Sequence, residues 1–517
     1  MAKYGTKTGF DSMVSSGLKL LSNDELDTLH YATLQVLKKT GIKVESQLAA
    51  DLFQSGGASV QKSDGYALVK IPAHLVEDSI QSAPSTITFY GRTPEDDFVA
   101  EPNRYSFTNV GVVPSVVDLK SGDTRPFVKQ DSADVARLCD ALDEVMVFER
   151  AGLPTDCPTE SIQLHNFEAM LANTSKHIMG CAGSVEKFNR IVQMAAECCG
   201  SMDTFNDRPC ITMNLTVSSP LFILATCSDI TIAAARQGVN VVGISMTMAG
   251  GTSPVTLAGT LVQSNAEILS LLVLNQLANK GAPYTYSQTS VMMDLKTGLG
   301  ALGAPETGLI NAASAQLAQY YRLPYWAGGA GYNDSKIVDA QAILEGTLNA
   351  LFLALSGANI IMGGGSINSI LTFDYGKMVI DHEMFRYIRK MVDGIQINEE
   401  TLALDVIDQV GPGGNYLAHD HTFDHMRDMT PAGLFCRTGF EQWVGAGRQG
   451  MYERAREKAT ELLSTHEPRA LPDGAADRMK DIVAAFEKEK GITGNRCDIM
   501  HKKASSTTHH QPMSAKS

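Results

Sequence analysis

The stretch Leu323–Gln341 has the sequence LPYWAGGAGYNDSKIVDAQ and carries the clearest signal of the fold. The strand-forming pair Tyr325-Trp326 is followed by a glycine-rich turn over 328–331, and polar residues then precede an apolar segment with helical spacing. Parallel barrels repeat this order of strand, turn and helix, and their functional residues lie in the loops that follow the strands. The stretch therefore predicts one strand tip of a parallel barrel, with a candidate site beside it.

The same pattern recurs from about residue 104 onward. A short run of β-branched or aromatic residues is followed by a loop, often with glycine, and then by an apolar segment of helical period. The predicted strands are Tyr105–Val110, Val145–Glu149, His177–Gly180, Cys210–Thr216, Val241–Met246, Tyr284–Gln288, Tyr325–Gly328 and Asn359–Met362. Strands that alternate with helices indicate a parallel sheet, so we predict an α/β protein with a (β/α)8 TIM-type barrel over residues 104–395. An open, doubly wound sheet is the alternative, because periodicity does not show closure.

The regions on either side of the predicted barrel have other patterns. Residues 1–103 predict an N-terminal α+β cap, which opens with a helix over 22–40 whose start, Ser22-Asn23-Asp24-Glu25, has the capping-box pattern. Residues 396–503 predict a C-terminal helical region that packs on the barrel or on a partner. Residues 504–517 are polar and without periodicity, and we expect a disordered tail there.

Composition narrows the classes of function. The formal net charge of −14 argues against nucleic acid as a partner, because phosphate binding relies on basic patches. No uninterrupted apolar run approaches the roughly 20 residues of a membrane span, and the N-terminus has no apolar signal segment. We therefore expect a cytoplasmic protein that is not inserted in a membrane, with its nine scattered cysteines reduced. We also expect a homo-oligomer.

Metal and nucleotide motifs are weak in this sequence. The histidines of His419-x-His421-x3-His425 lie in the C-terminal region rather than at a strand tip, and a zinc site needs a further ligand. A Gly-x-Gly-x-x-Gly pattern over Gly298–Gly303 follows polar residues rather than a buried strand, so the match is interpreted as accidental. We predict no intrinsic metal ion and no nicotinamide cofactor.

Aromatic residues near the predicted strand tips indicate a site for a cation. A quaternary ammonium group has no N–H to donate, so a protein holds it with ring faces, at about 0.5–2 kcal/mol per contact. The candidate rings are Tyr105, Phe107, Trp326, Tyr332 and Phe373, and His165 and Gln288 are candidates for orienting a polar tail of the substrate. Core packing is the alternative role for each ring, and an internal hydrogen bond is the alternative for His165 and Gln288.

Several blocks of the sequence resemble the trimethylamine methyltransferase superfamily. They are Asn23–Leu26, His30–Thr33, Met248–Thr260, Asn265–Glu267, Ala354–Asn359, Leu371–Phe373 and Glu400–Ile407. The resemblance implies a barrel that passes a methyl group from a methylated amine to the Co(I) of a corrinoid, which a separate cognate protein carries.

The chain departs from the trimethylamine enzymes at one position. Those enzymes have a pyrrolysine shortly before an Asp-small-Lys triplet, here Asp334-Ser335-Lys336, and this chain has Gly331 or Tyr332 at that place. The departure implies the pyrrolysine-free branch, similar to glycine betaine:corrinoid methyltransferase, with a quaternary amine as substrate and a tertiary amine as product. Asp334 and Lys336 would then brace the loop, and positioning would supply most of the rate without an assigned catalytic residue.

Two alternatives remain at this point. One is a non-catalytic protein that binds quaternary amines or acts as a scaffold. The other is a barrel lyase or aldolase, for which Lys336 is the nearest candidate for a Schiff-base lysine. The sequence does not distinguish glycine betaine from other betaines, because the size of a pocket depends on side-chain packing.

Overall fold

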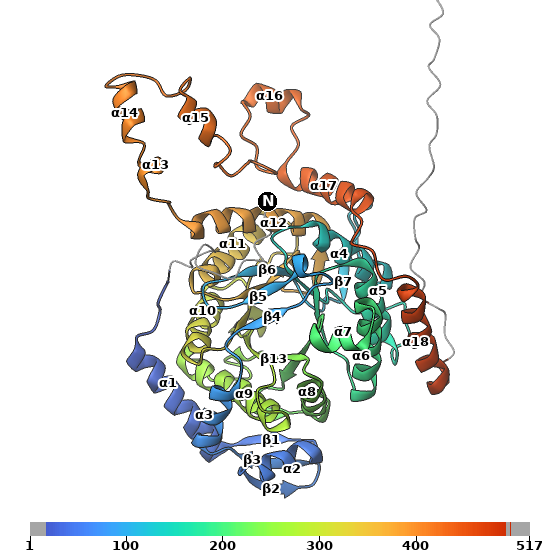
Figure 1. The fold of residues 1–517 in the computed structure, drawn as a ribbon. Helices are drawn as coiled ribbons and strands as arrows, with labels where there is room; N and C mark the ends of the chain where they lie inside the picture. Colours follow the sequence, from blue (N-terminus) through green and yellow to red (C-terminus); the bar gives the residue numbers. More distant parts are fainter. Residues whose placement is uncertain (1–16, 493–496, 498–517) are drawn as a thin grey trace, which may run out of the picture.

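The computed structural model describes residues 17–492 and Cys497, and the predicted tail at 504–517 lies outside the described residues. Eight parallel strands form the centre of the molecule (Figure 1). In chain order they are β6 (Ser106–Asn109), β9 (Val147–Glu149), β10 (His177–Gly180), β11 (Ile211–Val217), β13 (Asn240–Ser245), β15 (Tyr284–Gln288), β18 (Tyr325–Gly328) and β19 (Ile360–Gly364).

The sheet closes into a barrel. β19 pairs with β6 in parallel, and a parallel bridge between Phe107 and Val145 joins β6 to the segment that leads into β9. Each strand lies within or overlaps one of the predicted runs, which confirms the (β/α)8 prediction. The open doubly wound sheet is wrong, because closure leaves no edge strand.

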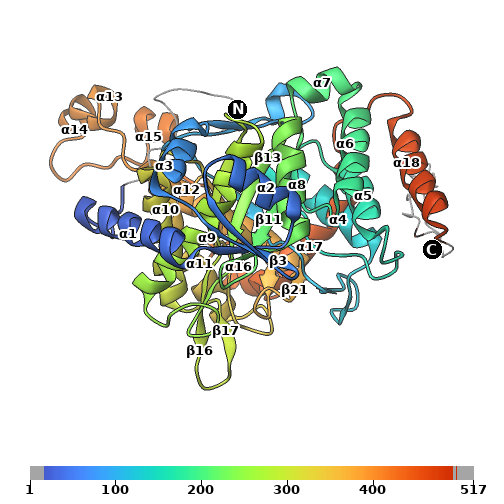
Figure 2. The same ribbon diagram turned by 90° about the horizontal axis from the view of Figure 1, so that it is seen from below.

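A ring of helices surrounds the strands (Figures 1 and 2). After successive strands the chain forms α4 (Lys129–Ala141), α5 (Ile162–Asn173), α6 (Val185–Cys199), α8 (Ala225–Gln237), α9 (Leu257–Ala278), α10 (Pro305–Tyr320), α11 (Ala340–Leu355) and α12 (Tyr375–Asp393). By length and composition α9 alone among the helices of the described residues could span a membrane, but 72% of its apolar window is buried within this fold. We therefore interpret α9 as a core helix of the barrel.

Side chains alternate between the inside of the barrel and the helices. Asn240 donates to the hydroxyls of Thr212 (3.2 Å) and Thr285 (3.1 Å) on the neighbouring strands, inside the barrel. Tyr284 and Tyr286 of β15 point outward instead, and their hydroxyls donate to Ile268 O and Asn265 Oδ1 of α9. A residue's place in this alternation therefore decides whether its side chain can reach a site on the barrel axis.

A hairpin packs against the side chains inside the barrel. Its strands are β4 (Ile87–Phe89) and β5 (Phe98–Ala100), and Phe89 and Phe98 cluster with the inward-facing Met179, Val242 and Trp326. His177, the first residue of β10, lies edge-on to Phe89 with ring centroids 5.1 Å apart. The hairpin therefore lies at the amino-terminal end of the barrel.

The N-terminal residues form a small α+β layer. It contains α1 (Asn23–Gln35), a π-helix (Val36–Thr40), β1 (Ile42–Val44), α2 (Gln47–Ser55), β2 (Ser59–Ser63), β3 (Tyr66–Lys70) and α3 (Ala73–Ser82). The predicted capping box is confirmed, since the side chains of Ser22 and Glu25 each bond the other residue's backbone. The sheet runs β12-β1-β3-β2, and its edge strand β12 (Phe222–Ile223) comes from the barrel segment. The cap is thus hydrogen-bonded to the barrel.

The C-terminal region contains six helices within its described residues. They are α13 (Glu399–Leu402), α14 (Leu404–Val410), α15 (Asp420–His425), α16 (Phe440–Gly445), α17 (Met451–Thr465) and α18 (Ala475–Lys490). The predicted helix over 401–410 is interrupted at Ala403, whose φ is +49°. α17 packs on α12 and α4, and α18 packs on α5 and α6.

One short motif can be placed in this fold. Gly298–Gly303 lies at the turn and second strand of an antiparallel hairpin, β16 (Val291–Asp294) with β17 (Leu299–Ala301), which projects from the barrel in Figure 2. This is not the strand-to-helix turn that a dinucleotide needs.

Cys157 and Cys497 form a disulfide, so the prediction that all cysteines are reduced is wrong for this pair. The two cysteines are 340 residues apart in the sequence, so no short spacing between them could have suggested this disulfide.

Candidate active site

The barrel interior is accessible to solvent at the carboxyl ends of its strands. Thr216 of β11 and Met246, directly after β13, point inward by strand alternation and are exposed. Asn214 lies two residues before Thr216 and is partly exposed, as is the inward-facing Met362 of β19. We call this opening the mouth and define it by Thr216, Met246, Asn214 and Met362. Loops follow the strands at this end, which is where barrel proteins hold their functional groups.

Glu149 lies at the mouth as the last residue of β9. Its side chain is fully buried, and its Oε1 accepts a hydrogen bond from Asn214 Nδ2 at 2.9 Å. Oε2 has no hydrogen-bond partner among the described residues. Burial raises the pKa of Glu149 to about 8, although the charge of Arg150 and the bond from Asn214 oppose the rise. A buried carboxylate with a free oxygen is a group that a cationic ligand would stabilise.

The glycine turn after β18 is fixed by close packing. Gly331 has a φ of +77°, and a Cβ there would lie 2.8 Å from Asp381 Oδ2 and 2.9 Å from the carbonyl oxygen of Gly363. Asp381 forms a buried ion pair with Lys377 and accepts from the Gly365 amide at 2.8 Å. Only glycine fits at 331, so a large side chain could not occupy this position.

Tyr332, the next residue, is buried against the strand tips. Its hydroxyl lies 2.8 Å from the point that a Cβ on Gly328 would occupy, and its ring clusters with Val291 and Leu302. Burial raises the pKa of the Tyr332 hydroxyl, and the charge of Glu149 raises it further. Tyr332 lies beside the end of β18 and Glu149 at the end of β9, so both lie at the same end of the barrel.

Trp326 lies deeper on the barrel axis. Its ring centroid is 6.3 Å from that of Phe89, and Met362 packs against both the cluster of Trp326 and the cluster of Tyr332. The Trp326 Nε1 has no hydrogen-bond partner among the described residues. The same holds for the hydroxyl of Ser287 in β15 and for that of Thr289 just after β15, and both side chains face inward. The wall below Tyr332 therefore presents three unpaired polar groups.

Two of the candidate rings point away from the mouth. Phe107 stacks on Phe385 of α12, with centroids 4.1 Å apart and an interplanar angle of 2°. Tyr105 lies edge-on to Phe107, and the Arg389 guanidinium is 4.7 Å from its ring centroid. The predictions for Tyr105 and Phe107 are corrected, because both rings pack between β6 and α12.

Phe373 also packs outside the barrel interior. It lies in β21 (Thr372–Asp374), which pairs with β20 (Ser366–Ile367) and β7 (Ser115–Val117) in a small sheet. Its ring is edge-on to Tyr375 at 5.2 Å and fills the space beside Gly365. These contacts correct the prediction for Phe373, which supports the small sheet rather than a cage.

Gln288 faces α10 rather than the mouth. Its Oε1 accepts from the Ser314 hydroxyl, and its Nε2 donates to Ser290 Oγ at 3.1 Å. The alternation of β15 sends residue 288 outward with Tyr284 and Tyr286, so the prediction of a substrate-orienting role is corrected. The internal hydrogen-bond role is the one observed.

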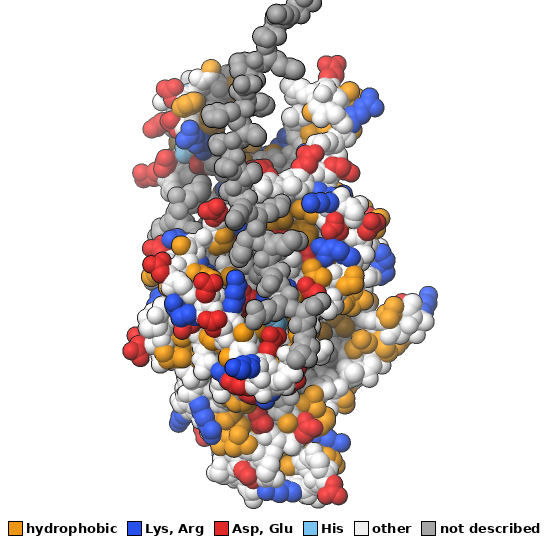
Figure 3. Space-filling view, turned by 90° about the vertical axis from the view of Figure 1, so that its right-hand side faces the viewer, with side chains coloured by type: hydrophobic (Ala, Val, Ile, Leu, Met, Phe, Trp, Pro, Cys, Tyr) orange, Lys and Arg blue, Asp and Glu red, His pale blue; other side chains and the backbone are white. Residues whose placement is uncertain are grey.

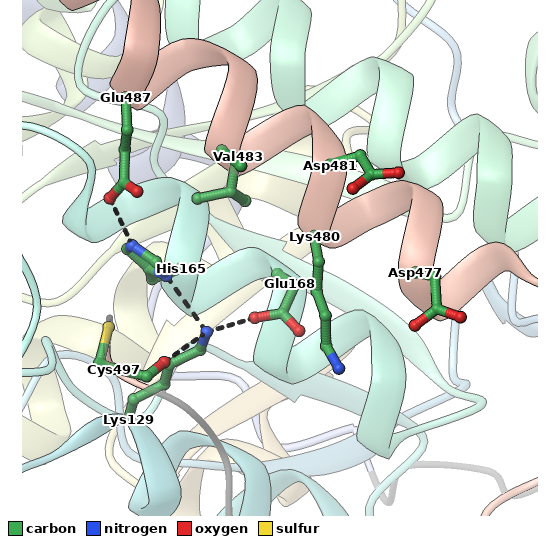
Figure 4. Close-up of a pocket in the computed structure, with 10 residues that line it drawn as sticks. Lys129, His165, Glu168, Asp477, Lys480, Asp481, Val483, Glu487 and Cys497 are labelled. Atoms are coloured by element: carbon green, nitrogen blue, oxygen red, sulfur yellow. Dashed lines mark hydrogen bonds and ion pairs between the residues drawn. The ribbon is translucent and has the colours of Figure 1, made fainter. Parts of the chain in front are cut away.

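His165 lies outside the barrel, in a pocket of about 550 Å³ between α5 and α18 (Figure 4). One ring nitrogen is 2.8 Å from Glu487 Oε1 and the other is 3.1 Å from Lys129 Nζ. Burial and the Lys129 charge lower the pKa of His165. The prediction for His165 is therefore corrected, because α5 directs this side chain toward α18.

The residues of the Asp334-Ser335-Lys336 triplet hold loops together. Asp334 accepts from the amides of Leu302 (3.1 Å) and Gly303 (3.0 Å) and from the Ser369 hydroxyl at 2.8 Å. Lys336 is exposed, and its Nζ donates to the carbonyl oxygen of Asp334 at 2.7 Å. Asp334 thus joins the loops that follow β15, β18 and β19.

One group of metal-ligating side chains occurs in the described part of the chain, namely Cys157, His165 and Cys497. The two sulfurs are bonded to each other, and both nitrogens of His165 have partners. In the C-terminal region, His425 pairs with Asp428 at 2.7 Å and His419 contacts Gln409 at 3.3 Å. Neither set forms an open metal site in this arrangement.

The fold defines an α/β-barrel protein, and its candidate site lies at the carboxyl end of the barrel. The sequence profile described as "Trimethylamine methyltransferase (MTTB)" matches residues 10–491. The chain belongs to this family of methyltransferases.

Three known proteins are similar to this chain. It is 42% identical to the trimethylamine methyltransferase MttB of Desulfitobacterium hafniense over 92% of this chain and 95% of that one. It is 30% identical to the glycine betaine methyltransferase of the same species over 91% of this chain and 98% of that one. The solved structure of the monomethylamine methyltransferase MtmB of Methanosarcina barkeri aligns with 87% of this chain and 95% of its own chain. The sequence identity is 14% and the TM-score is 0.49.

Proposed function

We propose that this protein transfers a methyl group from a quaternary amine, glycine betaine or a related betaine, to Co(I) of a corrinoid carried by a cognate protein. The observation that carries the proposal is the buried carboxyl of Glu149 at the mouth, whose Oε2 has no hydrogen-bond partner among the described residues, at the same end of the barrel as Tyr332. The proposal rests on the family, on a sequence that contains no pyrrolysine, and on the chemistry of this pair.

Tyr332 is our candidate for the position that pyrrolysine holds in the trimethylamine enzymes. A side chain at 331 would collide with Asp381 and Gly363, whereas the side chain at 332 reaches the strand tips. A methylated cation between this ring and Glu149 would gain the attraction of a ring face and of a carboxylate. The positive charge would also favour the ionised form of Glu149.

The polar tail of a betaine would point toward the deeper groups. In the part of the chain that the structure describes, the Trp326 N–H and the hydroxyls of Ser287 and Thr289 are donors without a hydrogen-bond partner, deeper in the barrel than Tyr332. A carboxylate in reach of these three donors would form charge-assisted hydrogen bonds. The tail would then fix the nitrogen with one methyl group directed out of the mouth.

Transfer needs no proton in this scheme. Co(I) supplies the electron pair for the new cobalt–carbon bond, the carbon–nitrogen bond breaks, and its pair stays on nitrogen, which leaves as a neutral tertiary amine. The barrel contributes by holding nucleophile, methyl and nitrogen in line, which is worth about 7–11 kcal/mol in well-oriented systems. Asp334 and Lys336 would keep the loops in register for this alignment.

The rim of the mouth offers apolar side chains to a partner. Val112, Met246 and Leu371 follow three different strands and are 40%, 48% and 49% exposed. Leu295 and Leu299 at the β16–β17 hairpin are each 67% exposed. Exposed apolar groups around a functional opening are typical of protein-binding surfaces, and we assign this rim to the corrinoid protein.

The test is a methyl-transfer assay with purified components. The protein is mixed with a Co(I) corrinoid protein and glycine betaine, and conversion to methyl-Co(III) is followed by its absorption spectrum. We expect conversion with a betaine and none with trimethylamine. Conversion with trimethylamine alone would refute the substrate class, and betaine binding without any conversion would favour the non-catalytic alternative.

A further inference from the structure

The segment between α12 and α17 has almost no core of its own. We call residues 394–450 the arm, and it contains α13, α14, α15 and α16. Among all its residues only Leu434 is buried. Figure 1 shows the arm standing away from the barrel above α12, with α13 to α15 in one lobe and α16 in the other.

Isolated helices of this size do not persist in water. The four arm helices have four to seven residues each, whereas an isolated helix needs about 12–15 residues to be even marginally stable. The arm contacts its own body mainly near Leu434, where Phe435 meets the Tyr387 ring and Arg437 donates to the Tyr387 hydroxyl at 2.7 Å. Another surface must therefore order the first lobe.

The first lobe is rich in exposed apolar side chains. They include Ile395 (90%), Ile397 (78%), Leu404 (67%), Ile407 (52%), Leu417 (82%) and Phe423 (73%). Figure 3 shows hydrophobic side chains between charged ones on the lobes at the top of the molecule. Several large apolar side chains exposed on one lobe are typical of a protein-binding surface.

The same chain carries a second uncovered apolar surface on the adjoining side. Leu344 and Leu348 form an i, i+4 row on α11 and are 62% and 59% exposed, and Ile337 just before the helix is 66% exposed. The row borders a pocket of about 700 Å³ lined by Val338, Ile343 and Ile380, among others. We call Ile337, Leu344 and Leu348 the α11 row.

Charge and position make these two surfaces complementary. The arm carries Glu399, Glu400, Asp405, Asp408, Asp420, Asp424, Asp428 and Glu441 against Arg427, Arg437 and Arg448. The exposed cations Lys336 and Lys390 lie next to Ile337 in sequence and at the end of α12. The acids near the row already have partners, since Asp339 caps α11 and Glu345 accepts from the Asp334 amide.

We propose that the arm docks on the α11 row of a second copy of this chain, in a reciprocal exchange. The arm starts at the end of α12, and α12 packs against α11, so both surfaces lie on one side of the barrel. A twofold axis on that side lets each copy cover the other's row, which closes the assembly without leaving a free arm. A specific interface needs about 800 Å² per partner, so the docked arm would have to cover surface around the α11 row as well as the row itself.

The test compares two double variants by light scattering after size exclusion. Wild-type full-length protein is expected to be a dimer or a multiple of one. Leu404→Asp with Ile407→Asp impairs the arm, and Leu344→Asp with Leu348→Asp impairs the row, so each protein alone is expected to shift toward the monomer. The control Leu48→Asp, at a 47% exposed leucine on α2, should keep the wild-type mass.

Mixing the two double variants distinguishes exchange from other modes of association. A mixed pair contains one intact arm and one intact row, so we expect a heterodimer although neither variant associates alone. Hydrogen exchange gives a second readout, since amides of 395–410 should lose protection in the row variant, whose substitutions lie outside the arm. A monomeric wild type, including one that assembles only with a corrinoid protein, or a mixture that stays monomeric, would overturn the proposal.

Discussion

Replacing Glu149 by glutamine is expected to stabilise the protein while impairing its function. The carboxyl has an ordinary pKa of 4.5 in the unfolded chain and of about 8 in the folded protein. The folded state therefore holds a proton that the unfolded chain has lost, and the cost to stability grows as pH rises from 4.5 to 8. At about 1.4 kcal/mol per pH unit, the cost is about 2 kcal/mol at pH 6 and about 3 kcal/mol at pH 7.

Glutamine keeps the oxygen that accepts from Asn214 and has no charge to bury. The gain in free energy of unfolding over wild type, measured by urea denaturation, should increase from pH 6 to pH 8 and then level off at about 5 kcal/mol. Loss of the anion should weaken binding of a quaternary ammonium about tenfold or more, as expected for a desolvated charge.

Glu267 supplies the matched control for this experiment. It is also buried with a raised pKa, but its oxygens accept from Ser219, Ser245 and the Leu221 amide. Glutamine at 267 would turn an acceptor into a donor against these donors, so this variant should be destabilised. A Glu149→Gln gain that does not change between pH 6 and pH 8 would refute the account of a buried, unpaired carboxylate.

Three further outcomes follow from the site and its surroundings. Tyr332→Phe should retain its affinity for a quaternary amine, measured by calorimetry, whereas Tyr332→Ala should lose about tenfold in affinity, because the ring face rather than the hydroxyl makes the contact. An equal loss of affinity in both variants would contradict this. Gly331→Ala should cost about 2–4 kcal/mol in denaturation, against about 1 kcal/mol for Gly298→Ala, because both have positive φ but only 331 lacks space for a Cβ. Thiol titration of the unfolded, unreduced protein should count seven free cysteines, and reduction should release the thiols of Cys157 and Cys497. A count of nine free thiols before reduction would show that all cysteines are reduced, as expected from the sequence.

The barrel could be predicted from the sequence because each unit repeats a local pattern. Turn chemistry and helical period mark where a strand ends and a helix begins, as in Leu323–Gln341, and all eight predicted runs correspond to strands. The Ser22–Glu25 capping box was equally readable, since it depends on four consecutive residues. Closure could not be read from the pattern, because it depends on pairing between the first strand and the last.

The site was harder to predict because a barrel strand is buried on both faces. An aromatic at Phe107 and one at Trp326 look alike in sequence, yet one packs on α12 and the other lies on the axis. His165 follows β9 but lies on an outer helix, where rotation about the helix axis decides its direction. Glu149 was missed although a signal existed, namely a single acid at the end of the otherwise apolar run Val145–Phe148.

The proposed site, with one carboxylate and one ring, differs as a receptor from a cage of five rings. In a cage, each ring contributes a similar small attraction and no single loss is decisive. In the proposed site the charge of Glu149 would supply the largest attraction, and because the oxygen is already desolvated in the folded protein, little further desolvation would oppose binding. A quaternary nitrogen keeps its charge at every pH and would hold Glu149 ionised, whereas in the empty site the buried carboxyl holds a proton near neutral pH. Binding of the substrate would therefore release a proton from Glu149, because only the ionised carboxyl attracts the cation.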